Sequence, residues 1–514
     1  MWRLIGGILL LALIVAIIVV VKTFTYPFTP VAKTAPASAD ATTLRIEDIS
    51  LQRFAGGIQI PTVSNADYTH FNYQPFDSFM VYLRQVYPLL YEKLEYYTIN
   101  QRGMVFHWKG SNAALKPVLF LSHYDVVPPG NSGDVDSVPG PFKPGDQALP
   151  PINAIAQAWD HFPFSGAVEH GRVYGRGTLD MKNMLFALLE ACEKLVKEGF
   201  KPSRDIYFAF GFDEEVGGTQ GAQLIADDFK QKGIRFDAVY DEGGIVSTKG
   251  SLTGIDATVA LIGCAEKGFW SARVKVKGLG GHSSMPPLET AIGKAAVIMQ
   301  RLEKDQMKPM VIPVIDQFFT NVGGTMSFTS RMAIANQWLL KGVLMRSLTK
   351  SHTTNALVRT TTALTMLKGS DASNVLAPEV EFVVNFRLLP GNKVADVRKH
   401  LENACKGYEV TIEDYSPPRE ASGISSIASQ GYTVMKRTIG KLFPDALVTP
   451  YLTIGGTDAY KYEQVSDHVY RFSPVAINNF EQQTIHNNNE YISVTNFARM
   501  IRYYELMFRE YDQP

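Results

Sequence analysis

The sequence lacks the residues and motifs that mark several classes of metal-binding and hydrolytic protein. It contains three cysteines, Cys192, Cys264 and Cys405, which are widely separated and never form a C-x-x-C pair. This excludes a disulfide scaffold and a cysteine-rich zinc module, so any metal must be bound by His and carboxylate side chains. The G-x-S-x-G elbow of serine hydrolases and the H-E-x-x-H pattern of single-zinc peptidases are also absent.

The chain also lacks an excess of charge of either sign. Lys plus Arg and Asp plus Glu each number 50, so the formal net charge is zero. Without a broad basic surface, nucleic acid is excluded as a partner. Hydrophobic residues make up 46% of the 514 residues, which is enough for large cores, and this length predicts roughly two or three domains.

One long apolar run stands at the N-terminus. The segment from Leu4 to Val21 contains only apolar residues and glycine and is flanked by Arg3 and Lys22. Its 18 residues are about the length that crosses a bilayer core. We therefore expect residues 1–22 to anchor the protein in a membrane, with the catalytic domain exported to the cell envelope. The alternative is a secreted protein whose signal is cleaved within Ala35–Ala41.

The remaining chain predicts an α/β domain interrupted by an insertion. A linker at 23–45, rich in Pro, Ala, Thr and Ser, precedes it. Buried strands are predicted at 117–122, 205–212 and 236–240, with helices at 184–198 and 222–232 between them. Strands that alternate with helices favour a mostly parallel sheet covered by helices. This domain is expected to comprise residues 46–265 and 417–514.

The pattern changes in the predicted insertion, residues 266–416. Strands at 269–277, 360–367, 380–388 and 408–415 alternate with helices at 288–303 and 394–405, in the order βαββαβ. That order is typical of a ferredoxin-like α+β domain. Additional material at 305–357 includes the apolar stretch 309–319, PMVIPVIDQFF, which either packs in the insertion's core or lines a groove for an acyl chain or membrane.

Candidate metal ligands follow the predicted strands. His123 and Asp125 lie two apart on an extended chain and face the same way. One can therefore bind a metal while the other fixes its tautomer. Glu214 and Glu215 are adjacent carboxylates, which repel each other unless a cation offsets their charge. The ordinary alternatives are a polar strand end and a solvated acidic pair.

Three further candidates come from other loops. Asp180 lies on a glycine-rich turn before a helix, where the alternative role is a helix N-cap. Asp241 ends another predicted strand, and His486 lies in the late segment TIHNNNEYI. Ligands collect at the carboxyl ends of strands in open α/β sheets, so these loops can converge. Imidazole and carboxylate ligands without thiolate suit catalytic zinc.

Together these motifs resemble the M20 metallopeptidase family, most closely its branch of carboxypeptidase S and N-acyl-amino-acid hydrolases. The resemblance covers residues from about 50 to 514. It rests on the motifs SHYDVVP, GRGTLDMK, DEEVGG, DEGG, GLGGHSSMP, SNVLAP followed by NFRLLPG, GGTDAYKY and TIHNNNEYI.

The resemblance implies a role for each matching residue. Two zinc ions per subunit would be bound by His123, Asp180, Glu215, Asp241 and His486, with Asp180 as the bridge. Glu214 would be the general base, Asp125 would orient His123, and His282 of the insertion would reach the oxyanion from the partner subunit of a homodimer. The substrate would be contacted by Asn374, Arg387, Gly455, Gly456 and Thr457.

The family further implies hydrolysis of an amide bond next to a free carboxylate, as in a carboxypeptidase. The alternative is an aminoacylase that cleaves long-chain N-acyl amino acids. A non-catalytic ectodomain would be expected to lose ligands, and this sequence retains all five together with the base.

Overall fold

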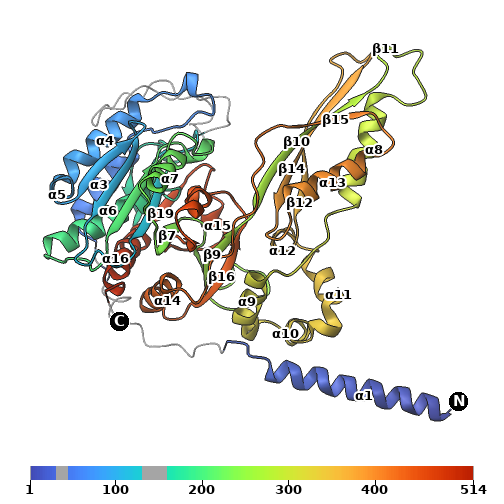
Figure 1. Ribbon diagram of the computed structural model, residues 1–514, viewed down its shortest axis with the longest axis horizontal. Helices are drawn as coiled ribbons and strands as arrows, with labels where there is room; N and C mark the ends of the chain where they lie inside the picture. The colour runs from blue at the N-terminus through green and yellow to red at the C-terminus, as the bar shows by residue number, and fades with distance from the viewer. Residues whose placement is uncertain (1, 30–43, 45, 130–158, 513–514) are drawn as a thin grey trace. The chain divides into compact units, whose positions relative to one another are not determined.

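The structure is a computed structural model that describes residues 2–29, 44, 46–129 and 159–512 (Figure 1). The chain divides into two compact units. The α/β unit comprises residues 30–264, 425–450 and 457–514, and the inserted unit comprises 1–29, 265–424 and 451–456. The predicted insertion, 266–416, thus begins one residue later and ends eight earlier than residues 265–424. Most of the predicted linker, and the possible cleavage segment, lie outside the described residues.

A ten-stranded sheet forms the centre of the α/β unit, in the order β1-β2-β6-β3-β7-β17-β9-β8-β18, with β16 paired to β9. Its middle is parallel, because β3 pairs in parallel with β6 and β7, and β7 with β17. The strands are β1 (Glu95–Ile99), β2 (Gly103–Trp108), β3 (Val118–His123), β6 (Ile206–Gly211), β7 (Ala238–Asp241), β8 (Val246–Ser247), β9 (Val259–Glu266), β16 (Leu447–Thr453), β17 (Val469–Arg471) and β18 (Ala476–Ile477).

Both faces of this sheet are covered, which explains why its central strands are continuous apolar runs. On β3, Leu119 and Leu121 pack in a cluster with Ile225 and Phe229 of α7 (Ala222–Gln231). The side chain between them, Phe120, contacts the opposite layer, where its ring lies 5.1 Å from that of Phe508 in α16 (Val494–Glu510). Alternate side chains of one strand therefore enter two cores, and the predicted mostly parallel α/β fold is confirmed.

The parallel strands deliver the candidate ligands to one edge of the sheet. β3 ends at His123, β7 ends at Asp241, and the short helix η4 (Glu214–Val216) follows β6. The helix α6 (Lys182–Lys197) begins directly after Asp180 and is buried along most of its length.

The inserted unit contains the predicted ferredoxin-like arrangement. Its antiparallel sheet has the order β12-β14-β10-β15, formed by β12 (Thr361–Lys368), β14 (Glu379–Leu388), β10 (Gly268–Lys277) and β15 (Val410–Asp414). Alternate residues of β10, from Trp270 to Val276, are buried in one core with α8 (Ala291–Lys304) and α13 (Val394–Cys405). A strand with one covered face needs this alternation, and it made β10 recognisable.

The additional material of the insertion is helical. It forms α9 (Pro313–Val322), α10 (Phe328–Ala335), α11 (Gln337–Leu348) and α12 (His352–Val358). Within the apolar stretch 309–319, Ile315, Phe318 and Phe319 are buried, and the Phe318 ring lies 5.9 Å from that of Tyr451. Of its two interpretations, these contacts support core packing.

The N-terminal run forms α1 (Trp2–Thr25), which ends three residues beyond the predicted anchor. Among the described residues it is the one helix long and apolar enough to cross a membrane. Only Val19 and Thr23 of this helix are buried. Because the predicted signal peptide would pass the same test, the helix by itself leaves anchor and signal as alternatives.

Candidate metal centre

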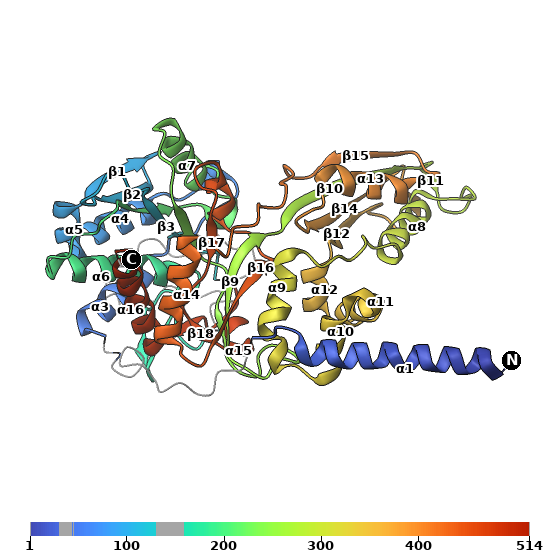
Figure 2. The same ribbon diagram turned by 60° about the horizontal axis from the view of Figure 1, so that its bottom comes forward.

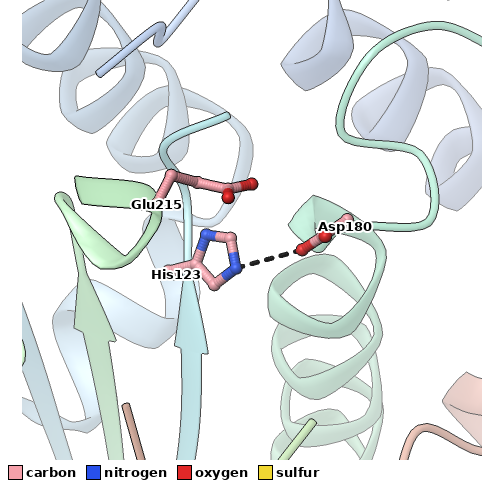
Figure 3. Close-up of side chains that lie close together, drawn as sticks. All are labelled: His123, Asp180 and Glu215. Atoms are coloured by element: carbon pink, nitrogen blue, oxygen red, sulfur yellow. Dashed lines mark ion pairs between the residues drawn. The ribbon is translucent and has the colours of Figure 1, made fainter. Parts of the chain in front are cut away.

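The centre of the site is the imidazole of His123, which is 2% exposed. Its Nδ1 lies 3.0 Å from the backbone oxygen of Asp125 and 3.2 Å from that residue's carboxylate. Its Nε2 lies 3.2 Å from both Asp180 and Glu242, but makes a properly directed hydrogen bond to neither. A buried nitrogen that faces carboxylates without bonding to them is the arrangement of a metal ligand. Figure 3 shows the ring beside Asp180 and Glu215.

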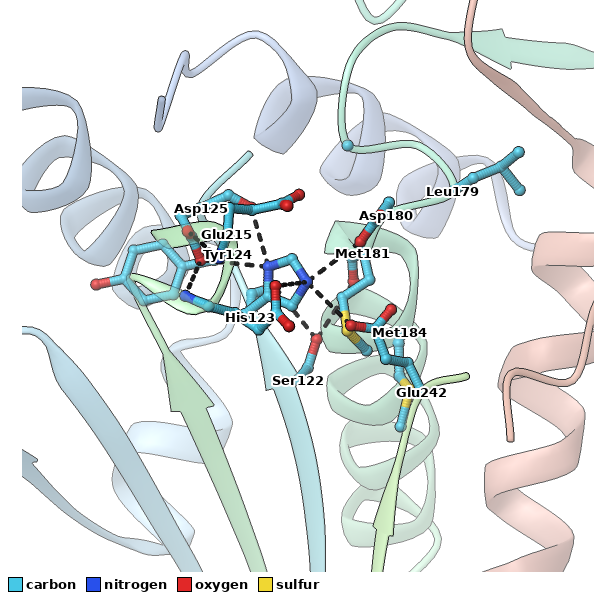
Figure 4. Close-up of polar contacts among 12 residues, drawn as sticks. Ser122, His123, Tyr124, Asp125, Leu179, Asp180, Met181, Met184, Glu215 and Glu242 are labelled. Carbon is cyan, nitrogen blue, oxygen red and sulfur yellow. Dashed lines mark hydrogen bonds and ion pairs between the residues drawn. The ribbon is translucent and has the colours of Figure 1, made fainter. Parts of the chain in front are cut away.

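Asp125 is fully buried and holds two parts of the site together. Besides its contact with His123, its carboxylate accepts hydrogen bonds from the backbone N–H groups of Glu214 and Glu215, both at 3.1 Å. The close-up in Figure 4 places it on the opposite side of the imidazole from Asp180 and Glu242. Asp125 therefore orients the imidazole, as predicted from the H-x-D spacing, and also fixes the adjacent acidic pair.

Asp180 lies between two histidines. One carboxylate oxygen is 3.2 Å from Nε2 of His123, and the other is 2.9 Å from Nε2 of His486. The same His486 nitrogen is 3.2 Å from Glu215. His486 adopts a φ of 59°, a conformation that is uncommon for residues other than glycine and that concentrates at functional sites. A carboxylate shared in this way has the geometry of a bridge between two cations.

At the end of β7 the structure brings Glu242, rather than Asp241, to His123. Glu242 was not among the residues selected from the sequence. The side chain of Asp241 is buried with one carboxylate oxygen lacking a hydrogen bond, and no ion pair joins it to His123 within the described chain. The DEGG motif presents both acids, but strand periodicity cannot tell which one turns inward once the strand has ended.

The turn that carries Asp180 is held by a second missed residue, Glu490. This fully buried carboxylate accepts hydrogen bonds from the backbone N–H groups of Gly177, Leu179 and Asp180, at 2.7 to 3.2 Å. It also forms a 2.7 Å ion pair with the buried Arg176. Glu490 lies four residues after His486 in the segment TIHNNNEYI, so one short segment supplies both a candidate ligand and the support of the bridge.

The crowding of acids shifts their pKa values. Burial, reinforced by neighbouring charges, raises the pKa of Glu215 to about 7 and of Glu242 to about 8. Burial also raises the pKa of Glu214 well above its usual range. Burial opposes the ionised form of Asp180, but its two histidine partners hold its pKa well below normal. The ion pairs with Asp180 and Glu215 raise the pKa of His486 to about 10.

These residues fit a metal. Two sets of side chains, His123–Asp180–Glu215 and His123–Glu214–Glu242, each bring their ligand atoms within 4.8 Å of one another. Nitrogen and oxygen ligands without sulfur match catalytic zinc. Positive charge at this position would also relieve the repulsion that raises the carboxylate pKa values.

The other predicted site residues belong mostly to the inserted unit. His282 is exposed on β11 (Gly281–His282), which pairs with β13 (Val375–Leu376). Its Nδ1 accepts hydrogen bonds from the backbone N–H and hydroxyl of Ser284, which places the proton of the neutral ring on Nε2. Asn374 is exposed, and its backbone oxygen accepts a hydrogen bond from Ser283.

Arg387 is half-buried on β14, with its guanidinium 4.8 Å from the Phe269 ring. Burial and the neighbouring Arg419 lower its pKa. Gly455 and Gly456 are exposed in the loop after β16. The adjoining Thr457 is buried in the α/β unit, and its hydroxyl caps the helix η6 (Asp458–Gln464) by accepting the N–H of Ala459.

Comparison with known proteins decides the family. A model of Peptidase family M20/M25/M40 matches residues 119–510. The chain belongs to this family. N-fatty-acyl-amino acid synthase/hydrolase PM20D1 of Xenopus tropicalis is 33% identical to this M20 chain over 99% of its length and 96% of the relative. Probable carboxypeptidase S-like 2 of Dictyostelium discoideum is 33% identical over 89% of this chain and 84% of the relative.

Solved structures agree with this assignment at the level of the fold. The M20 metallo-carboxypeptidase Sso-CP2 from Sulfolobus solfataricus superposes with a TM-score of 0.62 and 19% identity, over 91% of this chain and 99% of that one. Human carnosine dipeptidase 1 gives a TM-score of 0.61 and 16% identity, over 91% and 96%. The resemblance drawn from the motifs is confirmed, and this M20 protein is a metal-dependent amide hydrolase.

A first prediction concerns Glu490. Glu490→Gln removes the charge that Arg176 pairs with and weakens the hydrogen bonds to the Asp180 turn, so metal affinity should fall by about 10- to 100-fold. Competition with a chromogenic chelator measures this change. Glu481→Gln, in the preceding helix α15 (Asn479–Gln482) and outside the cluster, is the control and should bind metal as wild type does. Equal affinity of both variants would contradict the positioning role.

A second prediction concerns pH. Without metal, the raised pKa values of Glu215 and Glu242 mean that the folded protein binds more protons than the unfolded chain above about pH 4.5. The free energy of unfolding should therefore decrease as pH rises towards 8, and charged His486 contributes with the same sign until its pKa of about 10. Asp180, whose pKa is lowered, affects stability only at more acidic pH.

Thermal unfolding of chelator-treated protein should accordingly show a Tm lower by roughly 5 °C or more at pH 8 than at pH 5. Metal-loaded protein should keep or gain stability over the same range, because the metal replaces the protons. Glu242→Gln should flatten the metal-free profile. Parallel pH profiles with and without metal would contradict this account of the cluster.

Proposed function

We propose that the chain is a two-zinc hydrolase that cleaves N-acyl amino acids at the amide bond next to the free carboxylate. The observation that carries the proposal is the position of Asp180 between His123 and His486. One zinc would be bound by His123, Asp180 and Glu242, with Asp241 as the alternative third ligand. The other would be bound by Asp180, Glu215 and His486.

The chemistry divides between the metal and the protein. Bound at these ligands, zinc would supply Lewis-acid chemistry that polarises the amide carbonyl and activates water. Glu214 takes the proton from the attacking water and delivers it to the leaving amine. Two features support this role: its Oε2 lies 3.9 Å from His123 Nε2, and its pKa is raised by burial towards the range where it can both accept and release a proton.

We assign substrate recognition to the inserted unit. Arg387 binds the substrate carboxylate, because a half-buried guanidinium whose pKa is lowered by burial and by Arg419 is stabilised by an anionic partner. Asn374, Gly455, Gly456 and Thr457 line the substrate's path. His282 donates a hydrogen bond from its Nε2–H to the oxyanion that forms in the active site of the partner subunit. This role requires a homodimer.

Acyl substrates are preferred over peptides for a specific reason. The Xenopus relative, named for N-fatty-acyl amino acids, aligns with 99% of this chain, a range that includes most of the apolar N-terminal segment. We propose that α1 remains as an uncleaved anchor with the catalytic domain exported, and that membrane proximity favours substrates with apolar acyl chains. Carboxypeptidase activity is the second candidate, supported by the Dictyostelium relative.

A third prediction tests the base. Glu214→Gln should bind metal normally yet lose activity by on the order of a thousandfold, because it removes the proton carrier but no ligand. Asp180→Ala should lose both metal and activity, since it removes the bridge. Elemental analysis and kcat measured on the same samples separate the two effects, and Glu92→Gln at an exposed position serves as the control. More than a tenth of wild-type turnover in Glu214→Gln would refute the assignment.

A fourth prediction tests substrate class and the carboxylate contact together. Long-chain N-acyl amino acids should give a higher kcat/KM than dipeptides of the same C-terminal residue. Amidation of the substrate carboxylate should lower kcat/KM by on the order of 100-fold in the wild type, but little in Arg387→Ala, because the contact is already lost. Arg273→Ala, on the neighbouring strand, should behave as wild type. If dipeptides are cleaved best, the carboxypeptidase candidate replaces the acylase.

A fifth prediction tests donation between subunits. An inactive His282→Ala protein mixed with an inactive Glu214→Gln protein should regain about a quarter of wild-type activity at random exchange, since each mixed dimer has one complete site. Glu214→Gln mixed with Asp180→Ala should stay inactive, because each change disables the active site of the subunit that carries it. Both sites of the mixed dimer are therefore defective. Differently tagged subunits that co-purify without recovered activity would refute donation by the partner.

A further inference from the structure

An apolar and basic surface is exposed on α11. Three large apolar side chains point away from the protein: Trp338 is 56% exposed, Leu339 48% and Val343 58%. On the opposite side of the helix, Leu344 and Leu348 are buried and fix it to the insertion. We call the surface formed by Trp338, Leu339, Val343, Arg346 and the adjoining Lys350 the α11 face. Large apolar side chains that share one exposed helix face usually mark a contact surface.

The α11 face adjoins the C-terminal turns of α1. The Nδ2 of buried Asn336, between α10 and α11, donates to the backbone oxygen of Val19 at 3.1 Å and to the hydroxyl of Thr23 at 3.0 Å. In the following turn the Lys22 ammonium lies 5.8 Å from the centre of the Trp338 ring. Figures 1 and 2 both show this end of α1 beside α10. The last turns of α1 are therefore attached to the insertion through directed hydrogen bonds.

The free part of α1 exposes a long apolar surface that suits a lipid environment. Its large apolar side chains before Val19 are exposed, including Leu9, Leu11 and Ile17 at more than half of their surface. A helix of 24 residues is about 36 Å long, enough to cross a hydrocarbon layer of about 30 Å. If this layer begins beyond Lys22, the lysine and the neighbouring Trp338 lie at the level of the headgroups, where both residue types are enriched.

The charge of this region matches an anionic surface. From Gln317 to Ser370 the sequence contains no Asp or Glu and six Lys or Arg: Arg331, Lys341, Arg346, Lys350, Arg359 and Lys368. Lys341, Arg346 and Lys350 are exposed on or next to α11. The chain as a whole is neutral, so this concentration of one sign is local. Basic residues near an anionic bilayer are attracted to it, and the attraction grows with their number.

We propose that the α11 face docks onto the headgroup layer of the same bilayer that α1 spans, with anionic lipids as its partner. Trp338, Leu339 and Val343 enter the boundary between headgroups and acyl chains, and the basic residues contact lipid phosphates. The insertion thereby gains a second membrane contact beside the anchor. This surface is distinct from the buried stretch 309–319 and from the metal cluster, and the proposal rests on α1 remaining in the membrane.

Site-specific fluorescence on the full-length chain tests the proposal. Single cysteines replace Leu339, Val343, Leu11 in α1 and, as an exposed control, Glu402 on α13, and each is labelled with an environment-sensitive fluorophore. The three native cysteines are buried, so labelling should be confined to the new positions. The variants are reconstituted in phosphatidylcholine vesicles with and without phosphatidylglycerol. Some vesicles carry lipids spin-labelled at the headgroup, which quench labels at 339 and 343, and others carry lipids spin-labelled in the middle of the acyl chain, which quench a label at Leu11.

Labels at 339 and 343 should be blue-shifted and quenched several-fold more strongly than the label at 402, and more strongly with phosphatidylglycerol. Replacing both Arg346 and Lys350 with Glu should reduce this quenching while leaving that at Leu11 unchanged. If Leu11 is quenched but 339 and 343 resemble 402, docking is overturned and the anchor stands. If Leu11 is not quenched, the anchor fails and docking with it. A blue shift of the label at 339 that grows with protein concentration, without quenching by lipids, would mean that a second copy of the chain covers the α11 face. That result would also overturn docking.

Discussion

The carboxylate of Asp180, shared between His123 and His486, is the contact on which the metal centre depends. The histidines come from segments more than 350 residues apart in the chain, and no other side chain among the described residues forms an ion pair with both. The position of this carboxylate is set by Glu490, which accepts hydrogen bonds from three backbone N–H groups of the Asp180 turn and forms an ion pair with a buried arginine. The bridging role that we propose for Asp180 requires a rigid carboxylate, because a shift of a few tenths of an ångström would change both ligand positions at once.

Repulsion among the carboxylates around Asp180 is the main electrostatic constraint on this site. Asp180, Glu214, Glu215 and Glu242 lie close together with little of their side chains exposed, and two histidines are the only described side chains that form ion pairs with them. Such a cluster opposes folding at neutral pH unless protons or cations neutralise it. The negative, preorganised site therefore lowers the free energy of unfolding of the metal-free protein. Metal binding raises it again, because the metal binds the folded state.

The two units have different physical tasks. The α/β unit supplies a rigid sheet edge where parallel strands end together, which is suited to metal ligands. The inserted unit carries the cationic Arg387, the exposed His282 and the helices attached to α1. In the function that we propose, recognition and membrane contact therefore belong to the insertion, and the ligand geometry belongs to the sheet.

The sequence alone determined the elements and the kinds of ligand. Apolar runs predicted β3, β6 and β7 to within about two residues, and α13 was predicted at the bounds that the structure has, because burial imposes periodicity along a continuous segment. His123, Asp180, Glu215 and His486, which the structure brings together, were also proposed as ligands from the sequence, because each lies in a recognisable motif.

Only the tertiary structure selected Glu242 over Asp241 as the neighbour of His123, and only it revealed Glu490 beneath the Asp180 turn. It also assigned Phe318 to the core and joined Asn336 to α1. Each of these depends on contacts between distant segments or on side-chain direction after a strand ends, and neither leaves a periodic pattern in the chain.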